Sequence, residues 1–156
     1  MDESDFMRVA IEKAREGIAA GQSPFGAVIV NGEHVLAAAH NTVWRDSDPT
    51  AHAEINAIRH AAIAVSGIDL ETCSIFSTCE PCPMCLAAIH WSKIRRVVFG
   101  ASISDAAAAG FSELSIRART MAKMGGSPLK VEGGLLRDEC RALFGIWKKN
   151  PSRKVY

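Results

Sequence analysis

Two short stretches, His52-Ala53-Glu54 and Pro81-Cys82-Pro83-Met84-Cys85, decide how this sequence is read. Together they supply one imidazole, two thiols and one carboxylate. The imidazole and the thiols are zinc ligands, one fewer than a tetrahedral site needs. Structural zinc sites usually fill all four positions with protein groups, whereas catalytic sites leave one position for water. We therefore predict a catalytic zinc site, one ion per subunit, held by the histidine and both cysteines, with the glutamate beside the open position.

The charges of these groups indicate the chemistry. One neutral imidazole and two thiolates cancel the charge of Zn²⁺, and the metal can lower the pKa of a bound water to about 7. Glu54 can move protons next to that water, first onto a ring nitrogen and then onto a leaving amino group. The H-x-E…P-C-x-x-C pattern is typical of zinc-dependent nucleobase deaminases. The expected reaction is hydrolytic deamination of an amidine-like carbon in a base.

Helix geometry constrains where these residues lie. Cys82 and Cys85 are three positions apart, so both sulfurs project from one helix face, near an N-terminus that lowers thiol pKa values. We expect Pro81 to open this helix. His52 and Glu54 are two positions apart, about 200° on an ideal helix. His52 must therefore lie at the very start of its helix, before the backbone becomes regular.

Other interpretations of the motif stay open. A lone Cys-x-x-Cys is also found in redox pairs, although redox chemistry would leave the histidine and the glutamate without a role. A non-catalytic zinc module that binds a protein or a nucleic acid would need a filled coordination sphere, and His40, His60 and His90 are candidates for its fourth ligand. The cysteines outside the motif are predicted to be small buried residues (Cys73 and Cys140) and a turn residue (Cys79).

Composition sets the broad class of protein. The chain has 156 residues, which predicts a single domain over 1–156. It is 48% apolar and 22% charged, and no apolar run reaches the roughly 18 residues of a membrane span. The acidic N-terminus and the odd count of five cysteines predict a cytoplasmic protein without disulfides. The net charge of +1 argues against a nucleic-acid binder, and the basic run from Lys148 to Lys154 is interpreted as a solvated tail.

The hydrophobic pattern predicts alternating helices and strands. Asn31-Gly32 is the signal of a type I′ β-hairpin, and alternation follows it along the rest of the chain. A hairpin followed by such alternation favours an α/β three-layer sandwich with a mixed five-stranded sheet flanked by helices. The expected helices cover residues 3–20, 51–65, from 81 onward, a segment ending near 123, and 135–149; the expected strands cover 25–30, 35–43, 73–78, 96–101 and 129–131.

Residues 50–59 and 77–85 resemble the cytidine deaminase-like superfamily, whose fold is a three-layer α/β/α sandwich. Within it, the resemblance is greatest to bacterial guanine deaminases and their plant guanosine deaminase relatives. Cys79 stands where tRNA adenosine deaminases typically carry leucine, and 105–111 resembles the D-A-A-x-A-G-F run of the guanine branch. Glu113 follows that run, and members of the branch often end in tyrosine, as this chain does.

The resemblance implies substrate contacts. An asparagine at the end of the second strand and a backbone N–H would hydrogen-bond the base, aromatic rings would wall the pocket, and a carboxylate would accept the adjacent N–H donors of guanine. The terminal tyrosine would close the site, from its own chain or from the partner in a homodimer that exchanges residues from about 134 to 156. These contacts fall on Asn41, Ala53, Phe25, Trp91, Glu113 and Tyr156. Ser112-Glu113 replaces the paired aspartates of some relatives, which leaves the role of Glu113 less firmly implied than that of Glu54.

Each of these residues also has an ordinary structural explanation. Phe25 and Trp91 also fit core positions, and Asn41 is a common residue at strand ends. Terminal residues such as Tyr156 are often disordered. The predicted activity is deamination of guanine to xanthine and ammonia. The rivals are guanosine, cytosine or cytidine, a triazine, and the tRNA wobble adenosine, the last of which would require a basic approach surface.

Overall fold

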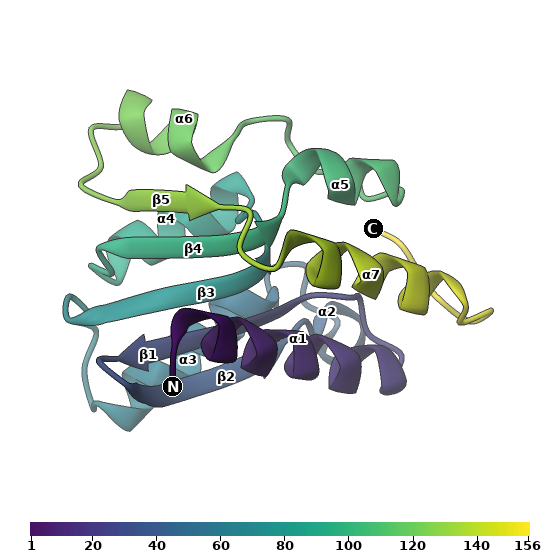
Figure 1. The fold of residues 1–156 in the computed structure, drawn as a ribbon, viewed down its shortest axis with the longest axis horizontal. Helices are drawn as coiled ribbons and strands as arrows, with labels where there is room; N and C mark the ends of the chain where they lie inside the picture. The colour runs from purple at the N-terminus through teal and green to yellow at the C-terminus, as the bar shows by residue number, and fades with distance from the viewer.

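The computed structural model describes residues 1–156 and shows a mixed five-stranded sheet between two layers of helices (Figure 1). The strand order is β2-β1-β3-β4-β5. Strand β1 is antiparallel to both β2 and β3, whereas β3, β4 and β5 run parallel to one another. The strands are β1 (Gly26–Asn31), β2 (His34–His40), β3 (Cys73–Cys79), β4 (Arg96–Ala101) and β5 (Lys130–Gly133).

Helices cover both faces of the sheet. Helices α1 and α7 lie on one face and α3 and α4 on the other, while α6 packs beside α4 and β5 (Figure 1). The predicted three-layer α/β/α sandwich is therefore confirmed. None of the helices combines the length and the apolar character that a membrane span requires. The helices are α1 (Glu3–Ala19), α2 (Val43–Asp46), α3 (Ala53–Ala64), α4 (Pro83–Trp91), α5 (Ile103–Ala108), α6 (Ala118–Met124) and α7 (Arg137–Lys148).

Helix α1 lies directly against β1. A capping box between Asp2 and Asp5 begins the helix, and Phe6, Ala10 and Ala14 are among the residues of its buried face. The approach to β1 is so close that a Cβ atom on Gly26 would lie 2.0 Å from the Ala10 carbonyl oxygen. Glycine at the first position of β1 therefore allows this helix to cover the sheet.

The hairpin between β1 and β2 differs from the predicted type I′ turn. Asn31 pairs with His34, so the two-residue loop is Gly32-Glu33. Only Gly32 has a positive φ, +59°, which is the pattern of a type II′ turn. The shift has a local cause: Ile29 pairs with Ala37 and the next residue pairs with Val35, so one residue of β2 bulges out of the ladder.

Two predicted elements have different bounds. Strand β2 ends at His40 rather than Val43, and the residues that follow form the short helix α2. The helix expected between the alanine- and glycine-rich segment 106–110 and residue 123 forms only as α6, and most of that segment belongs to a separate helix, α5, after which Gly110 takes a φ of +105°. The extended segment between α5 and α6 contains Glu113.

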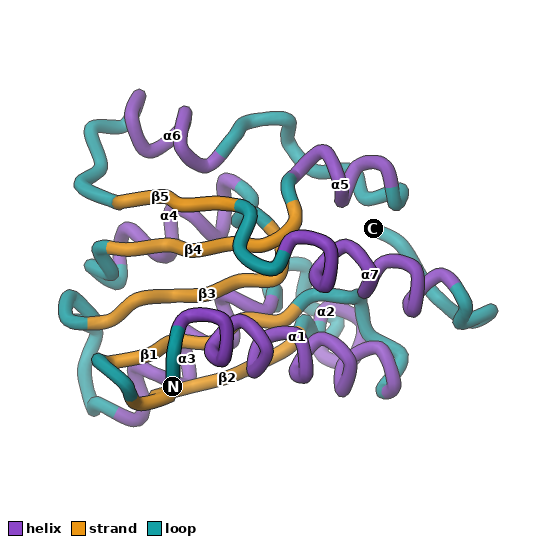
Figure 2. Tube along the Cα trace, in the orientation of Figure 1, coloured by secondary structure: helices purple, strands orange, loops and turns teal.

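Three strand ends meet at one end of the sheet. Gly26 pairs with His40 and Ala27 pairs with Ser77, so the start of β1 lies between the carboxyl ends of β2 and β3. The C-terminus of the chain lies beyond the carboxyl ends of β4 and β5 (Figure 2). In α/β sheets, the carboxyl ends of strands are the usual place for ligands.

Candidate active site

The predicted zinc ligands come together at the N-termini of α3 and α4. His52 is the N-cap of α3, with φ −67° and ψ 159°, so it lies in extended backbone just before the helix. This placement confirms the geometric condition for bringing His52 and Glu54 to one site. Cys82 is the N-cap of α4, and Cys85 lies in its first turn. Pro83 rather than Pro81 is the first helical residue.

The three side chains fit a metal ion. The His52 Nδ1 atom lies 3.7 Å from Cys82 Sγ and 3.5 Å from Cys85 Sγ, and all three ligand atoms lie within 4.8 Å of one another. One imidazole and two sulfurs are a donor set that zinc prefers. None of the other histidines belongs to this group. The site therefore has three protein ligands and an open fourth position, as a catalytic zinc site requires.

The two thiols differ in acidity. The pKa of Cys82 falls to about 4 because Cys85 donates a hydrogen bond to its sulfur and His52 lies beside it. The same bond, together with burial, raises the pKa of Cys85 well above its usual value. Both thiols were expected to be acidic, but only Cys82 has a lowered pKa, because the two sulfurs share one proton. Zinc binds thiolates, so metal binding releases that proton.

Glu54 lies beside the ligands without belonging to them. Its carboxylate is 6% exposed, and Oε1 accepts a hydrogen bond from Ser77 Oγ at 3.0 Å. Oε2 lies 3.5 Å from Cys85 Sγ. Burial raises the pKa of Glu54, and the nearby Cys82 thiolate raises it further. A raised pKa makes the carboxylate a better proton acceptor than an ordinary glutamate, which suits a general acid–base residue.

Burial alone would lower the pKa of His52. Its hydrogen bond to Cys82 and the charge of Glu54 outweigh that effect, so the pKa is raised. The imidazole is thus held in a cluster of negative groups, and its Nδ1 atom points toward the sulfurs. The electrostatics favour a positive charge at this point, which a Zn²⁺ ion supplies.

A small pocket opens next to the ligands. It is lined by Phe25, Asn41, His52, Glu54, Cys79, Glu80, Cys82, Glu113 and Tyr156. Asn41 is fully buried and its Oδ1 accepts the Val43 N–H, which leaves its Nδ2 directed at the Tyr156 hydroxyl. Phe25 packs edge-on against Phe111, with ring centroids 4.9 Å apart. Ala53 is buried at the first position of α3, where a backbone N–H has no acceptor within the helix.

Glu113 has an unusual environment in this pocket. Its Oε2 atom is buried without any hydrogen-bond partner. Burial raises the pKa of Glu113 to about 7, and the charges of Cys82 and Glu54 contribute. Buried carboxylate oxygens are normally paired, so an unpaired one facing a pocket is suited to a ligand that brings N–H donors.

Tyr156 occupies the pocket of its own chain. The Asn41 side chain donates to its hydroxyl, and its ring lies 5.6 Å from the ring of His52. Burial raises the pKa of Tyr156, so the hydroxyl stays protonated. The terminal residue is therefore ordered against the site, and closure of the pocket needs no second chain in this arrangement.

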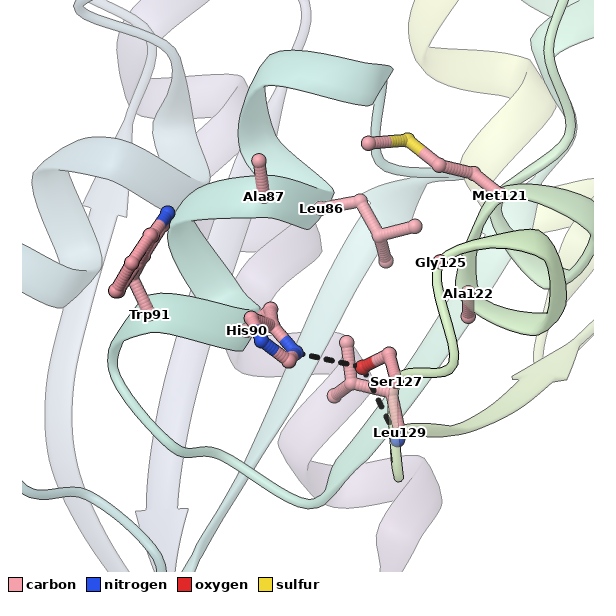
Figure 3. A pocket seen from close by; sticks show the side chains of 9 residues that line it. All are labelled: Leu86, Ala87, His90, Trp91, Met121, Ala122, Gly125, Ser127 and Leu129. Carbon is pink, nitrogen blue, oxygen red and sulfur yellow. Dashed lines mark hydrogen bonds between the residues drawn. The ribbon is translucent and has the colours of Figure 1, made fainter.

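Trp91 is not part of this pocket, contrary to prediction. Six residues separate it from Cys85, about 240° of helix rotation, which directs it to another side of α4. Its side chain is 80% exposed. Figure 3 shows it at the rim of a separate, mostly apolar pocket between α4 and α6. That pocket is lined by Leu86, Ala87, His90, Trp91, Met121, Ala122, Gly125, Ser127 and Leu129.

Ser77 and Glu80 line or support the site, although the sequence did not single them out. Ser77 hydrogen-bonds Glu54, and Glu80 is 5% exposed with both carboxylate oxygens occupied by backbone N–H groups. Ser77 lies in β3 beside other polar residues and Glu80 follows the strand, so neither stands out in the sequence pattern. A buried carboxylate beside a metal motif is seldom incidental.

Residues 1–101 match the cytidine and deoxycytidylate deaminase zinc-binding region. This chain belongs to that deaminase family. It is 44% identical to guanine deaminase of Bacillus subtilis over 114 residues, 72% of this chain and 73% of the relative. It is also 40% identical to tRNA-specific adenosine deaminase of Aquifex aeolicus over 101 residues, 65% of this chain and 67% of the relative.

A solved structure of guanine deaminase from Nitrosomonas europaea has the same fold, with a TM-score of 0.87 and 30% identity, covering 95% of this chain and 85% of the other. The resemblance to guanine deaminases is therefore confirmed, and so is the cytidine deaminase-like fold. The protein is a zinc-dependent enzyme that hydrolytically removes an amino group from a nucleobase.

Proposed function

We propose that this deaminase acts on guanine and yields xanthine and ammonia. The unpaired, buried Oε2 atom of Glu113 is the observation that carries the proposal. Guanine presents its N1–H and amino donors side by side, and a carboxylate accepts such a pair with two oxygens. Cytosine and adenine have no such pair of adjacent donors, so they would leave this carboxylate unsatisfied.

The remaining pocket residues orient the base. The Asn41 amide and the Ala53 backbone N–H are donors that fit the acceptor edge of a purine. Phe25 supplies an apolar wall, held in place by Phe111. Stacking and hydrogen bonding together hold the reacting carbon beside His52, Cys82 and Cys85. The base and the attacking water are then already oriented for reaction.

Glu54 moves the protons. His52, Cys82 and Cys85 would hold a Zn²⁺ ion, which would lower the pKa of an attacking water to about 7. Glu54 would accept a proton from that water and pass it to the ring nitrogen beside the reacting carbon. It would then take a second proton, from the hydroxyl now on that carbon, and give it to the amino group; the C–N bond breaks, ammonia leaves and a C=O bond forms. Ser77 keeps one carboxylate oxygen in place during both transfers.

A tRNA substrate is the nearest rival because tRNA-specific relatives also match. Two of the exposed cations of the C-terminal tail lie over aromatic rings. Arg153 lies over the Trp147 ring at 5.8 Å and Lys154 over the Trp44 ring at 5.2 Å. Tyr156 also covers the pocket, which suits a free base better than a nucleotide within a strand. A small purine is therefore the favoured partner, and the homodimer with exchanged tails stays a prediction.

The test is to incubate the purified, zinc-loaded protein with guanine, guanosine, cytosine, adenine and a tRNA anticodon stem-loop, and to assay ammonia. We expect release from guanine and little from the other substrates. Release from cytosine or the stem-loop, with none from guanine, would overturn the substrate while leaving the zinc chemistry intact. Ammonia from guanosine at a comparable kcat/KM would widen the substrate class to the nucleoside.

A further inference from the structure

The geometry points to Glu80 as a positioning residue that fixes guanine recognition by holding both ends of the segment that carries Glu113. This inference rests on the proposed function. Glu80 comes directly after β3 and is 5% exposed. Its Oε2 atom accepts the Ile103 N–H at 3.1 Å, and its Oε1 atom accepts the Ala118 N–H at 2.9 Å.

The two contacts are made at the N-termini of two helices. Ile103 is the first residue of α5 and Ala118 is the first residue of α6. Backbone N–H groups at the start of a helix have no acceptor within the helix. One buried carboxylate thus satisfies a donor at each boundary of residues 103–118 and pins them at a single point. The helix dipoles favour a negative charge there.

The middle of the segment has few other attachments. Phe111 is buried and packs against Phe25 and Trp147, with ring centroids 4.9 Å apart in both pairs. Beyond it, the Ser112 N–H reaches the Tyr156 carbonyl only at 3.5 Å. Glu113 itself has a free Oε2 atom. Its position in the pocket therefore depends on Phe111 from one side and on the Ala118 anchor from the other.

Glu80 is suited to holding the segment and not to proton transfer or substrate binding. Both of its oxygens already accept a backbone donor, whereas Glu54 and Glu113 each have an oxygen directed at the pocket or the ligand group. A glutamine at position 80 has one acceptor oxygen, and its amide NH₂ would face the other backbone N–H. The substitution therefore releases one end of the segment while preserving the size of the side chain.

The experiment compares Glu80→Gln, Glu113→Gln and the double variant, all zinc-loaded, in steady-state guanine kinetics. Loss of one charged hydrogen bond predicts a KM for guanine raised roughly tenfold in Glu80→Gln, with a much smaller change in kcat. Because Glu80 acts through Glu113, the double variant should show a KM no higher than that of Glu113→Gln alone. Fully additive effects would overturn the inference.

Amide hydrogen exchange provides a readout that does not depend on the substrate. In Glu80→Gln, exchange should accelerate in peptides from residues 103–118 and stay unchanged in α1. Glu80→Asp, which keeps both acceptor oxygens on a shorter side chain, should fall between glutamine and wild type. Glu132→Gln, a matched change of a carboxylate that pairs with Arg96 and Lys130 far from the pocket, should leave KM unchanged.

The outcomes separate this inference from the proposed function. If Glu113→Gln raises the KM for guanine and Glu80→Gln does not, only the role of Glu80 fails. If wild-type protein does not deaminate guanine, or if Glu113→Gln has no effect on KM, the proposed recognition fails. Exchange in residues 103–118 then still decides whether Glu80 holds the segment, and unchanged exchange in Glu80→Gln overturns it.

Discussion

The Glu54 carboxylate is held beside the three ligand residues, where it can transfer protons. Its carboxylate is buried between Ser77 Oγ and Cys85 Sγ, and its raised pKa reflects burial next to a thiolate. Glu54 is not in the ligand group, which consists of His52, Cys82 and Cys85, and we propose that it carries out the proton transfers.

Glu54→Gln should therefore separate metal binding from catalysis. The amide preserves the shape of the side chain but cannot accept a proton, so we expect one zinc per chain with turnover reduced by roughly 10²- to 10⁴-fold. Zinc content by metal analysis and ammonia release measure the two properties. Turnover near the wild-type level would remove Glu54 from the mechanism.

Glu113 predicts how guanine binding depends on pH. Its pKa of about 7 lies above the usual value because the side chain is buried. The ionised form accepts two N–H donors and is lost as the pH falls through about 7, so the KM for guanine should rise below that pH. The rise should approach tenfold per pH unit for one ionising group. Glu113→Gln should have a higher KM with no such pH dependence, and a wild-type KM that is flat from pH 8 to 5.5 would contradict the assignment.

Single-residue predictions from the sequence succeeded where chemistry and spacing set the position. The ligand set and Glu54 followed from residue types that few other roles require. Trp91 failed because an aromatic residue on a short helix has no chemical requirement that fixes its direction, and helix rotation placed it on an exposed face. Glu80 was missed because its partners are backbone N–H groups, which leave no trace in a pattern of side chains.

At the scale of elements, close packing between α1 and β1 explains why the strand begins with glycine. A Cβ atom on Gly26 would meet the Ala10 carbonyl oxygen at 2.0 Å and the Ala14 nitrogen at 2.7 Å. Both obstacles are backbone atoms, which cannot rotate away as a side chain would. The helix or the strand must shift as a whole.

Gly26→Ala should consequently lower the free energy of unfolding by about 3 kcal/mol, the upper range for overpacking. Gly145→Ala is the matched control: this glycine lies inside α7 with no atom within 4 Å of a Cβ position. Alanine there should raise the free energy of unfolding by roughly 0.5–1 kcal/mol through helix propensity. Urea denaturation followed by circular dichroism measures both, and equal stability of the two variants would show that the α1–β1 contact tolerates a methyl group.

Element boundaries were harder to predict than element types. All five strands were found, because runs such as β1 and β4 are mostly apolar on both faces. The hairpin turn was displaced by a single bulged residue in β2, and a bulge has no fixed sequence signal. The break between α5 and α6 follows from a positive φ at Gly110, and glycine within an alanine-rich run does not by itself indicate that conformation.

At the scale of the whole molecule, the C-terminal tail brings the last residue, Tyr156, into contact with Asn41, which follows β2. Tyr156 lines the pocket, whose cavity of about 10 Å³ is roughly the space of a single water. A purine cannot enter while the ring holds this position. The tail must therefore move when substrate binds and product leaves, as lids do in many enzymes. The sequence predicted closure by the tyrosine, but the packing of the tail on Trp147 and Trp44 needed the structure.

Deletion of residues 153–156 should open the pocket and remove the partner of Asn41. We expect kcat/KM for guanine to fall by roughly tenfold or more through the lost hydrogen bond and the access of water, with zinc content unchanged. Tyr156→Phe keeps the ring and loses the hydroxyl, so it should lie between wild type and the deletion. Unchanged kinetics in the deletion would show that the tail is no part of the site.

Mixing two impaired variants then shows which chain supplies the tail. The first carries Glu54→Gln with an intact tail, and the second has Glu54 but lacks residues 153–156. If tails stay with their own chain, as the contact between Asn41 and Tyr156 within one chain favours, no mixed dimer holds a complete site and activity is not restored. If tails are exchanged, the second chain receives Tyr156 from the first and activity returns after the two are refolded together. Co-refolded and separately refolded mixtures, compared at equal zinc content, distinguish exchange from simple addition of residual activities.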